Sequence, residues 1–409
     1  MQTHLAEAFR DTPEGQEAEA ILRACVHCGF CTATCPTYQI LGDELDGPRG
    51  RIYLIKQVLE GATPTRETQT HLDRCLTCRA CETTCPSGVQ YGRLVDIGRA
   101  VVEEAVGRDP ASRLARALVH RGLLAKPLFD TALRIGRALR PVLPASLKAK
   151  VPPLRDPGAW PEPRHTRRVL LLDSCVQTSL APVIDAAAAR VLDRIGLSLV
   201  WVPAGGCCGA LSHHMNEHER ASAIVKANID AWWPEIERGA EAVVSSASGC
   251  SVMLKDYGHF LRHDPDYRER AERIAALARD LSELVFDEWP RLAPLLPSEP
   301  EEPEEIAYHP PCTLQHGMKR RGQVEQMLAQ AGFKLLPVAD AHLCCGSAGT
   351  YSIFQPGLSA ELKRRKLAAL EAEGPRRIVT ANIGCLTHLA SGTRRPVQHW
   401  IELLDERLA

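Results

Sequence analysis

The sequence predicts an α+β protein of several domains, in which an all-α N-terminal domain is followed by two duplicated α/β halves. Three observations lead to this prediction. Apolar residues recur at helical spacing through much of the first 140 residues. Short apolar runs alternate with helical segments after residue 166, which is typical of a parallel sheet. Sixteen cysteines lie at spacings that repeat within each part of the chain.

The composition excludes several classes of protein. An apolar fraction of 45% excludes a disordered chain, and 49 basic against 50 acidic side chains leave no basic excess for binding nucleic acid. The polar start, MQTHLAEAFR, does not resemble a signal peptide, and no run of about 18 apolar residues suggests a membrane span. We therefore expect a cytoplasmic chain whose many thiols hold metal.

The N-terminal domain is predicted over residues 1–100, with a helix over residues 1–20. Its segment GPRGRIYLIKQVLEG, at 47–61, begins with a turn and continues as a helix with an apolar face. Residues 101–165 are expected to form a linker. This linker is helical and rich in arginine to about residue 140, and proline-rich over 141–163.

The two α/β halves are predicted over residues 166–295 and 306–409, joined by an acidic, proline-rich linker at 296–305. In the first half, strands are expected in VLLLDS, LVWVPAGG and EAVVSSASG. In the second half they are expected in IAYHPPC, FKLLPVAD and RIVTANIGC, with a helix over about 320–331. Strands that alternate with helices predict a largely parallel sheet in each half.

Each part of the chain is internally duplicated, and the cysteines show the period. The N-terminal motif at residues 25–36 recurs 50 residues later. In the C-terminal part a lone cysteine and a Cys-Cys-Gly loop recur 137 residues later, and a third cysteine site recurs after 135. The C-terminal cysteines are Cys175, Cys207, Cys208 and Cys250 in the first half, and Cys312, Cys344, Cys345 and Cys385 in the second.

The strings CVHCGFCTATCP and CLTCRACETTCP both have the spacing C-x2-C-x2-C-x3-C-P. Three thiolates at this spacing bind one [4Fe–4S] cluster, and the fourth binds the other cluster of a two-cluster ferredoxin. Structural zinc sites instead use cysteine pairs separated by a longer loop, so zinc fits the pattern poorly. The predicted ligands are Cys25, Cys28, Cys31 and Cys85 for one cluster, and Cys75, Cys78, Cys81 and Cys35 for the other.

The eight C-terminal cysteines follow strands, so the four of each half are expected to converge at the carboxyl edge of its sheet. Three interpretations stay open for them: a further iron–sulfur cluster, a redox-active thiol or disulfide site, or structural cysteines. The pattern resembles the cysteine-rich CCG domain of the heterodisulfide reductases and their relatives, whose motif ends in C-x2-C. Here Met253 and His388 stand where the last cysteine is expected, and we interpret Met253 as a core residue.

No Rossmann, P-loop or nucleophile-elbow motif occurs in the sequence, so no site for two-electron substrate chemistry is apparent. A separate flavoprotein partner is therefore expected. His213, His214 and His218 follow the first Cys-Cys-Gly loop, and His309 and His316 flank Cys312. We interpret these histidines as surface or hydrogen-bonded residues. The stretch 111–140 combines arginine and leucine at helical spacing, which suits a solvated or partner-facing helix or a membrane surface.

The order of these motifs, with GPRGRIYLIK, YHPPCTLQH and HLCCGSAGTYSIFQP, resembles the glycolate oxidase iron–sulfur subunits over nearly the whole chain. The resemblance implies FAD-binding partner subunits that oxidise glycolate to glyoxylate, and D-lactate less well. It also implies electron transfer to a membrane quinone and a peripheral position on the inner face of a bacterial inner membrane. Three alternatives are the iron–sulfur subunit of anaerobic glycerol-3-phosphate dehydrogenase, a disulfide-reducing CCG enzyme and a zinc scaffold.

Overall fold

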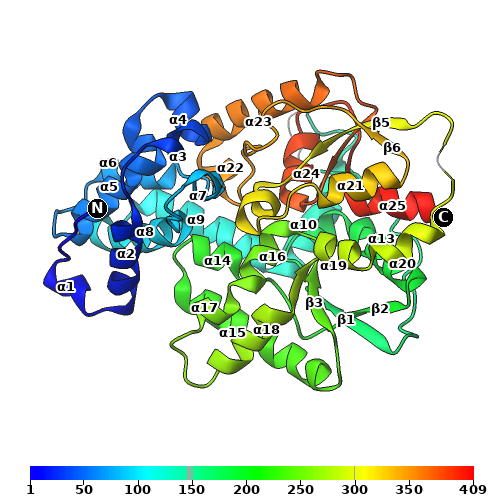
Figure 1. The fold of residues 1–409 in the computed structure, drawn as a ribbon, viewed down its shortest axis with the longest axis horizontal. Coiled ribbons are helices and arrows are strands. Elements are labelled where there is room, and N and C mark those ends of the chain that lie inside the picture. The colour runs from blue at the N-terminus through cyan, green and yellow to red at the C-terminus, as the bar shows by residue number, and fades with distance from the viewer. Residues whose placement is uncertain (145–147, 149–150, 299) are drawn as a thin grey trace.

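The computed structural model describes residues 1–144, 148, 151–298 and 300–409. The predicted linkers at 101–165 and 296–305 therefore lie partly outside the described residues. Figure 1 shows a helical N-terminal domain at one end of the molecule and two mixed α/β halves at the other. All sixteen cysteines are free thiols.

The N-terminal domain is all-helical, as predicted. Thr12 caps the N-terminus of α2, where Pro13 takes the first helical position. Gly50 lies on α5 against the carbonyl of Glu44, where a Cβ would come within 2.1 Å of the oxygen, so glycine is required there. The helices are α1 (Glu7–Arg10), α2 (Pro13–Ala24), α3 (Phe30–Ala33), α4 (Pro36–Leu41), α5 (Pro48–Leu59), α6 (Arg66–Asp73), α7 (Ala80–Thr84) and α8 (Tyr91–Val106), with a 3₁₀ turn at Glu44–Asp46.

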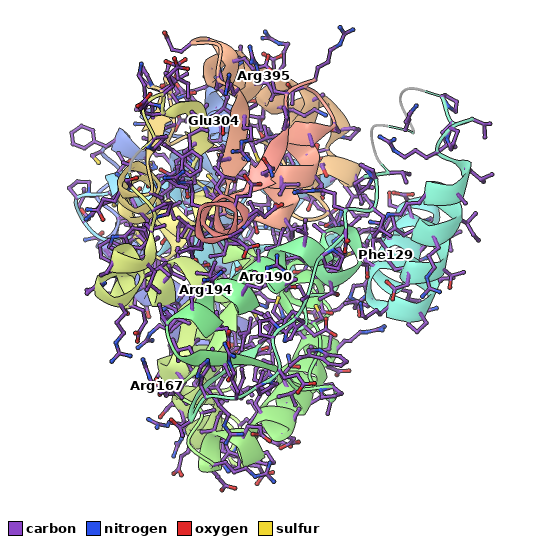
Figure 2. The ribbon with its side chains drawn as sticks, turned by 90° about the vertical axis from the view of Figure 1, so that its right-hand side faces the viewer. Phe129, Arg167, Arg190, Arg194, Glu304 and Arg395 are labelled. Carbon is purple, nitrogen blue, oxygen red and sulfur yellow. The ribbon has the colours of Figure 1, made fainter. Side chains whose placement is uncertain are left out.

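Two further helices, α9 (Pro110–Leu124) and α10 (Lys126–Leu139), connect the N-terminal domain to the halves. Figure 2 shows α10, which carries Phe129, at one side of the halves. His120 on α9 is buried, and its Nε2 hydrogen-bonds to Ser212 Oγ of the first half at 2.9 Å. Several apolar side chains of these two helices face solvent, namely Leu114, Leu118, Leu128, Ile135 and Leu139.

The first half is built on a parallel four-stranded sheet in the order β2-β1-β3-β4. Val169 at its centre pairs with Leu199 on one side and Ala242 on the other. The strands are β1 (Arg167–Leu171), β2 (Leu197–Trp201), β3 (Ala242–Ser245) and β4 (Ala278–Asp280). The helices are α12 (Gln177–Leu180), α13 (Pro182–Arg194), α14 (Ala210–His214), α15 (His218–Glu237), α16 (Ser248–Lys255), α17 (Tyr257–Phe260), α18 (Arg268–Leu277), α19 (Leu281–Asp287) and α20 (Trp289–Leu292), with a 3₁₀ turn at Ala293–Leu295.

The second half repeats this sheet in the order β6-β5-β7-β8. Its strands are β5 (Glu304–His309), β6 (Phe333–Leu335), β7 (Arg377–Thr380) and β8 (Val397–His399). Its helices are η3 (Thr313–Gly317, a π-helix), α21 (Gln323–Gln330), α22 (Tyr351–Phe354), α23 (Pro356–Glu371), α24 (Ile383–Ala390) and α25 (Trp400–Leu408). Both halves thus have the predicted parallel sheet and helices.

The two halves share one hydrophobic core, into which both sheets, α13 and α25 send buried side chains. Arg190 on α13 forms an ion pair with Asp405 on α25 at 2.6 Å, and Figure 2 shows Arg190 between the halves. His399 Nε2 hydrogen-bonds to the carbonyl of Ser246 at 3.0 Å. The halves therefore form one packed body.

The edge strands β4 and β8 were not predicted from the sequence. Their sequences, Ala-Arg-Asp and Val-Gln-His, are short and mostly polar, so they contain no apolar run to be recognised. β5 begins at Glu304, within the predicted acidic linker, because parallel pairing with β6 extends it past the apolar run. No helix in the described part of the chain has the length and apolar character to cross a membrane.

Candidate metal centres

The first group of thiols comes from Cys25, Cys28 and Cys31 together with Cys85 of the second motif. These four cysteines line one pocket. Burial, followed by the neighbouring Cys25 thiol, raises the pKa of Cys31 to about 11, and Cys85 and Cys28 add to the effect. Cys28 is exposed, whereas Cys25 is buried. The structure thus brings together the four thiols of the first predicted set, with one of them at the surface.

The second group combines Cys75, Cys78 and Cys81 with Cys35 of the first motif. Burial raises the pKa values of Cys78 and Cys81, and in both cases Cys75 and Cys35 are among the interacting thiols. Cys35, Cys75 and Cys81 are buried, and Cys78 is partly buried. The structure therefore brings this predicted set together as well, deeper in the protein than the first.

Local turns explain how the two motifs exchange one thiol each. Gly29 and Arg79 stand at equivalent places and have φ angles of 87° and 60°, so each reverses the chain before α3 or α7. Cys35 and Cys85 end these helices, and Thr34 and Thr84 meet between them, with their hydroxyls 3.1 Å apart. Because α3 and α7 lie face to face, the last cysteine of each motif reaches the group of the other.

A buried arginine, Arg51, and a partly buried one, Arg99, distinguish the second group. Burial opposes a low pKa at Cys75, but Arg51 and Arg99 outweigh it and lower the pKa of this thiol. The Cys75 sulfur also accepts hydrogen bonds from the Thr77 amide at 3.4 Å and from the Tyr91 hydroxyl at 3.6 Å. Positive charge and hydrogen bonds of this kind stabilise a thiolate.

Arg51 is the central residue of the GPRGRIYLIK segment and is 1% exposed. Its guanidinium donates to the His71 carbonyl at 2.7 Å and to Thr37 Oγ1 at 3.2 Å, and it pairs with Asp46 at 3.4 Å. A buried arginine is stable only when its donors are satisfied in this way. The segment thus places a fixed cation beside the second group.

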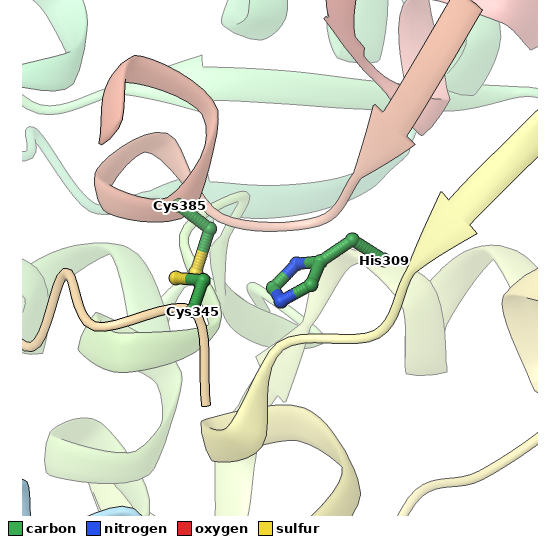
Figure 3. Close-up of side chains that lie close together, drawn as sticks. All are labelled: His309, Cys345 and Cys385. Atoms are coloured by element: carbon green, nitrogen blue, oxygen red, sulfur yellow. The ribbon is translucent and has the colours of Figure 1, made fainter. Parts of the chain in front are cut away.

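The third group consists of Cys312, Cys344, Cys345 and Cys385 in the second half. The sulfurs of Cys312 and Cys344 lie 3.9 Å apart. Cys345 interacts with both Cys344 and Cys385, which connects all four. Figure 3 shows Cys345 and Cys385 facing each other with His309 beside them, and one ligand atom from each lies within 4.8 Å of the others.

Gly346 permits the turn of the loop that carries the third group, and Lys366 places a positive charge beside its thiols. Gly346 has a φ of +90°, and a Cβ there would lie 2.8 Å from the Ser359 carbonyl oxygen, so the Cys-Cys-Gly turn needs glycine. Lys366 is 3% exposed, donates to the Asp340 carbonyl at 2.6 Å, and interacts electrostatically with the thiols of Cys345, Cys344 and Cys312. It is a buried cation next to the predicted thiolates.

The fourth group consists of Cys175, Cys207, Cys208 and Cys250 in the first half. Cys207 is hydrogen-bonded to Cys175 and Cys208, and Cys208 is hydrogen-bonded to Cys250. The bonds from Cys175 and Cys208 lower the pKa of Cys207. The Tyr257 hydroxyl donates to the Cys208 carbonyl at 2.9 Å and fixes the loop. In both halves, therefore, the four thiols converge as the strand positions predict.

The second and third groups adjoin each other. Cys78 interacts electrostatically with Cys312 and Cys344. Leu76, Cys344 and Tyr351 belong to one buried apolar cluster, with Cys78 and Cys312 packed against it. The Tyr351 hydroxyl donates to the Arg74 carbonyl at 3.1 Å, and Thr83 Oγ1 lies 2.8 Å from His316 Nδ1. The described contacts thus join the N-terminal domain to the second half directly beside the thiols.

The histidines singled out from the sequence have varied surroundings. His213 and His214 pair with Asp96 on α8, at 3.5 and 3.6 Å, and His218 stacks edge-on against His213. His316 faces Thr83 and the His342 carbonyl. His388 lies near Ser359 Oγ, at 3.3 Å, and outside the set formed by His309, Cys345 and Cys385. Met253 is 6% exposed in the core, which confirms its interpretation.

Sequence reasoning missed Arg51, Arg99 and Lys366 as residues of these sites. Arg51 carried a signal, because it lies in a motif that the resemblance picked out. Lys366 carried none, since it looks like one more charged residue in the basic helix α23.

These donor sets suit iron–sulfur chemistry. Fe–S clusters are held by thiolates, and each of the four groups offers four thiols. The basic side chains of Arg51, Arg99 and Lys366 would offset part of the negative charge that such clusters add.

Comparison with known families finds two matches in the chain. Residues 21–89 match the 4Fe-4S dicluster domain, and residues 169–255 and 306–390 each match the CCG cysteine-rich domain.

Whole-chain relatives include the glycolate oxidase iron-sulfur subunit of Escherichia coli, 52% identical over 100% of this chain and 99% of the relative. The probable glycolate oxidase iron-sulfur subunit of Bacillus subtilis is 32% identical over 92% of this chain and 90% of the relative. Lactate utilization protein A of an Exiguobacterium species is 25% identical over 58% of this chain.

Proposed function

The chain belongs to the family of glycolate oxidase iron–sulfur subunits, and on this premise we propose the route that electrons take through it. It is an electron-carrying subunit of an oxidoreductase. FAD-bearing partner subunits oxidise glycolate to glyoxylate, and D-lactate less well. Single electrons then pass through this chain to a membrane quinone. The packing of Cys78 and Cys312 against the buried cluster that contains Cys344 carries the proposal, because it places two thiol groups side by side on one path.

The eight N-terminal thiols are the proposed ligands of two [4Fe–4S] clusters. Cys25, Cys28, Cys31 and Cys85 hold the first, and Cys75, Cys78, Cys81 and Cys35 hold the second. The crossed sharing of Cys35 and Cys85 supports the assignment, since this spacing is used in that way by two-cluster ferredoxins. This sharing would hold the two centres next to each other, as a path for electrons requires.

Each C-terminal half is proposed to hold one further iron–sulfur centre, on Cys312, Cys344, Cys345 and Cys385 and on Cys175, Cys207, Cys208 and Cys250. Convergence of four thiols at the end of a parallel sheet supports this proposal over a purely structural role. The clusters supply one-electron redox chemistry when they are bound. We propose the same domain boundaries that the sequence predicts.

The direction of electron flow follows from exposure. The first group is the proposed point at which electrons arrive, because Cys28 is exposed and Val26 and Phe30 beside it are more than half exposed. The second group lies deeper and adjoins the second half. Arg51 and Arg99 stabilise added negative charge at the second group, and Lys366 does so at the third.

The proposed location is the cytoplasmic face of the inner membrane, where the quinone is found. The exposed leucines and arginines of α9 and α10 support this peripheral position, because such helices bind at anionic lipid surfaces.

The test is an anaerobic purification of the complex with its flavoprotein, followed by electron paramagnetic resonance after adding glycolate, D-lactate or glycerol 3-phosphate. Signals of reduced clusters with glycolate are expected. Signals with glycerol 3-phosphate alone would assign the chain to that dehydrogenase instead. Absence of a flavoprotein and of any substrate-reduced signal would favour a disulfide reductase.

The Cys28→Ser variant tests the path itself. It is expected to lose the first cluster and electron flow to quinone, while substrate still reduces the partner flavin. Normal quinone reduction by this variant would refute the path.

A further inference from the structure

His309 is the last residue of β5 and lies at the carboxyl edge of the sheet, where the thiols of the second half converge. Its side chain is 1% exposed, and its Nε2 has no hydrogen-bond partner among the described residues. A buried polar atom without a partner is costly, so it needs a physical explanation. A missing ligand is one such explanation.

The hydrogen bonds of Thr380 fix the protonation of this imidazole. The Thr380 hydroxyl donates to the His309 carbonyl at 3.0 Å, and the same oxygen lies 3.0 Å from His309 Nδ1. Because the hydroxyl proton is used on the carbonyl, Thr380 accepts the proton of Nδ1. Nε2 is then the unprotonated nitrogen, and its lone pair is free.

The imidazole ring lies next to two thiols. Figure 3 shows the His309 ring beside Cys345 and Cys385, and the three ligand atoms lie within 4.8 Å of one another. The second bond of a metal-bound histidine normally goes to an oxygen, as the bond from Nδ1 to Thr380 does here.

The first half has no such residue. At the position 137 residues before His309 stands Leu172, which is 1% exposed and apolar. Met253, which follows the last cysteine of the first half, packs in the core. Among the described side chains at equivalent places, the first half therefore offers its thiols alone.

His388, which the sequence indicated, is a weaker candidate. Its Nε2 faces Ser359 Oγ at 3.3 Å, and its ring also hydrogen-bonds to the backbone at Cys345. The ring is thus already engaged with protein groups, whereas Nε2 of His309 is not.

We infer that His309, through Nε2, is an iron ligand of the centre in the second half, beside Cys345 and Cys385. The inference rests on the proposed function, since it requires a cluster at this site. The two halves would then hold chemically different centres, one with thiolates alone and one with thiolates and an imidazole.

This ligation affects the reduction potential of the centre. The imidazole of His309 is neutral, so it keeps the potential higher than an anionic thiolate at the same place would. The buried ammonium of Lys366 acts in the same direction. The centre of the second half then accepts electrons from the adjacent group that contains Cys78.

The experiment uses the holoprotein, purified anaerobically after growth with ¹⁵N-histidine or with unlabelled histidine. Pulsed electron paramagnetic resonance of the reduced protein measures nitrogen coupled to the clusters. A strongly coupled nitrogen that changes with the histidine label is expected in the wild-type protein. It is expected to be absent from His309→Leu, which copies Leu172, and retained in His388→Gln.

Iron content is measured on the same samples. A second-half cluster signal without coupled histidine nitrogen, or a coupling that persists in His309→Leu, would overturn the inference while leaving the electron-carrier proposal intact. An iron content of eight per chain, or zinc at the site, would also overturn the inference about His309. Reduction of the N-terminal clusters by glycolate would in that case still support the electron-carrier proposal.

His309→Cys keeps an iron ligand at this position but replaces the neutral imidazole by an anionic thiolate. It is expected to keep the iron content, lose the nitrogen coupling and lower the midpoint potential of this centre. An unchanged potential would contradict the assignment.

Discussion

The two cysteine-rich halves have the same sheet order and the same cysteine pattern, yet their thiols have different neighbours. In the second half, the thiols lie beside Cys78 of the N-terminal domain, the imidazole of His309 and the ammonium of Lys366. In the first half, Leu172 stands at the position equivalent to His309, and Ile229 stands at the position equivalent to Lys366. Both residues are buried and apolar.

The halves also contact the N-terminal domain differently, although they use equivalent elements. On α22, Tyr351 is 8% exposed and donates to the Arg74 carbonyl. At the equivalent position on α14, His214 is largely exposed and pairs with Asp96 at 3.6 Å. The duplicated scaffold is thus the same in both halves, whereas the residues around the two thiol groups differ.

The largest effect is expected on the rate of quinone reduction, which should differ between cysteine variants of the two halves. Cys344→Ser is expected to slow quinone reduction with glycolate at least about tenfold, because it removes a ligand from the centre next to the second cluster. Cys207→Ser changes the equivalent thiol of the first half and is expected to slow it by less than about threefold. Steady-state turnover of the whole complex measures both, and equal losses would contradict a path through the second half alone.

A smaller effect is expected at the contact between Tyr351 and the N-terminal domain. Tyr351→Phe leaves the Arg74 carbonyl without its partner in an apolar cluster, so it should lower the free energy of unfolding by about 1–2 kcal/mol. Calorimetry of the anaerobic holoprotein would show a lower Tm. Tyr53→Phe, at a 45% exposed site, serves as the control and should leave Tm unchanged. A Tm equal to that of wild type would show that the contact adds nothing.

Acid should weaken the second half. Burial lowers the pKa of His399 to about 3, so its neutral ring must gain a proton on unfolding when the pH is below about 6.5. Stability therefore falls as the pH falls, by about 1 kcal/mol between pH 7.5 and 5.5. Hydrogen exchange in β8 and α25 should report this loss. His399→Asn replaces the capping nitrogen of His399 by an amide oxygen and should make the pH dependence shallower.

The first half should show the opposite dependence, with a smaller magnitude. Burial opposes protonation of His213, but its bond to Asp96 outweighs burial and raises its pKa. This stabilisation is fully present below about pH 6.5 and is lost as the pH rises through the raised value. The protection factors of the amides in α14, which correct for the intrinsic rise of exchange with pH, should therefore fall toward alkaline pH in the wild type and less so in His213→Gln. The exposed His4→Gln is the control, and the same slope in all three proteins would contradict the assignment.

Much of this molecule could be predicted from residue type and spacing. The two C-x2-C-x2-C-x3-C-P strings indicated both N-terminal thiol groups, including the exchange of Cys35 and Cys85 that α3 and α7 produce. The apolar runs located six of the eight strands, because a buried parallel strand leaves a continuous apolar signal. The strands β4 (Ala-Arg-Asp) and β8 (Val-Gln-His) carry polar residues and leave no apolar run.

The sequence by itself determined the cysteine groups, the duplicated halves and the electron-carrier role, because ligand spacing and strand periodicity are local properties of the chain. Only the tertiary structure decided which half adjoins the second thiol group, and that the imidazole beside the thiols of the second half is that of His309 rather than that of His388. The first feature depends on cysteines that are far apart in the sequence. The second depends on which imidazole ring packs beside the thiols. Packing and hydrogen-bond geometry determine them, and no local pattern records either.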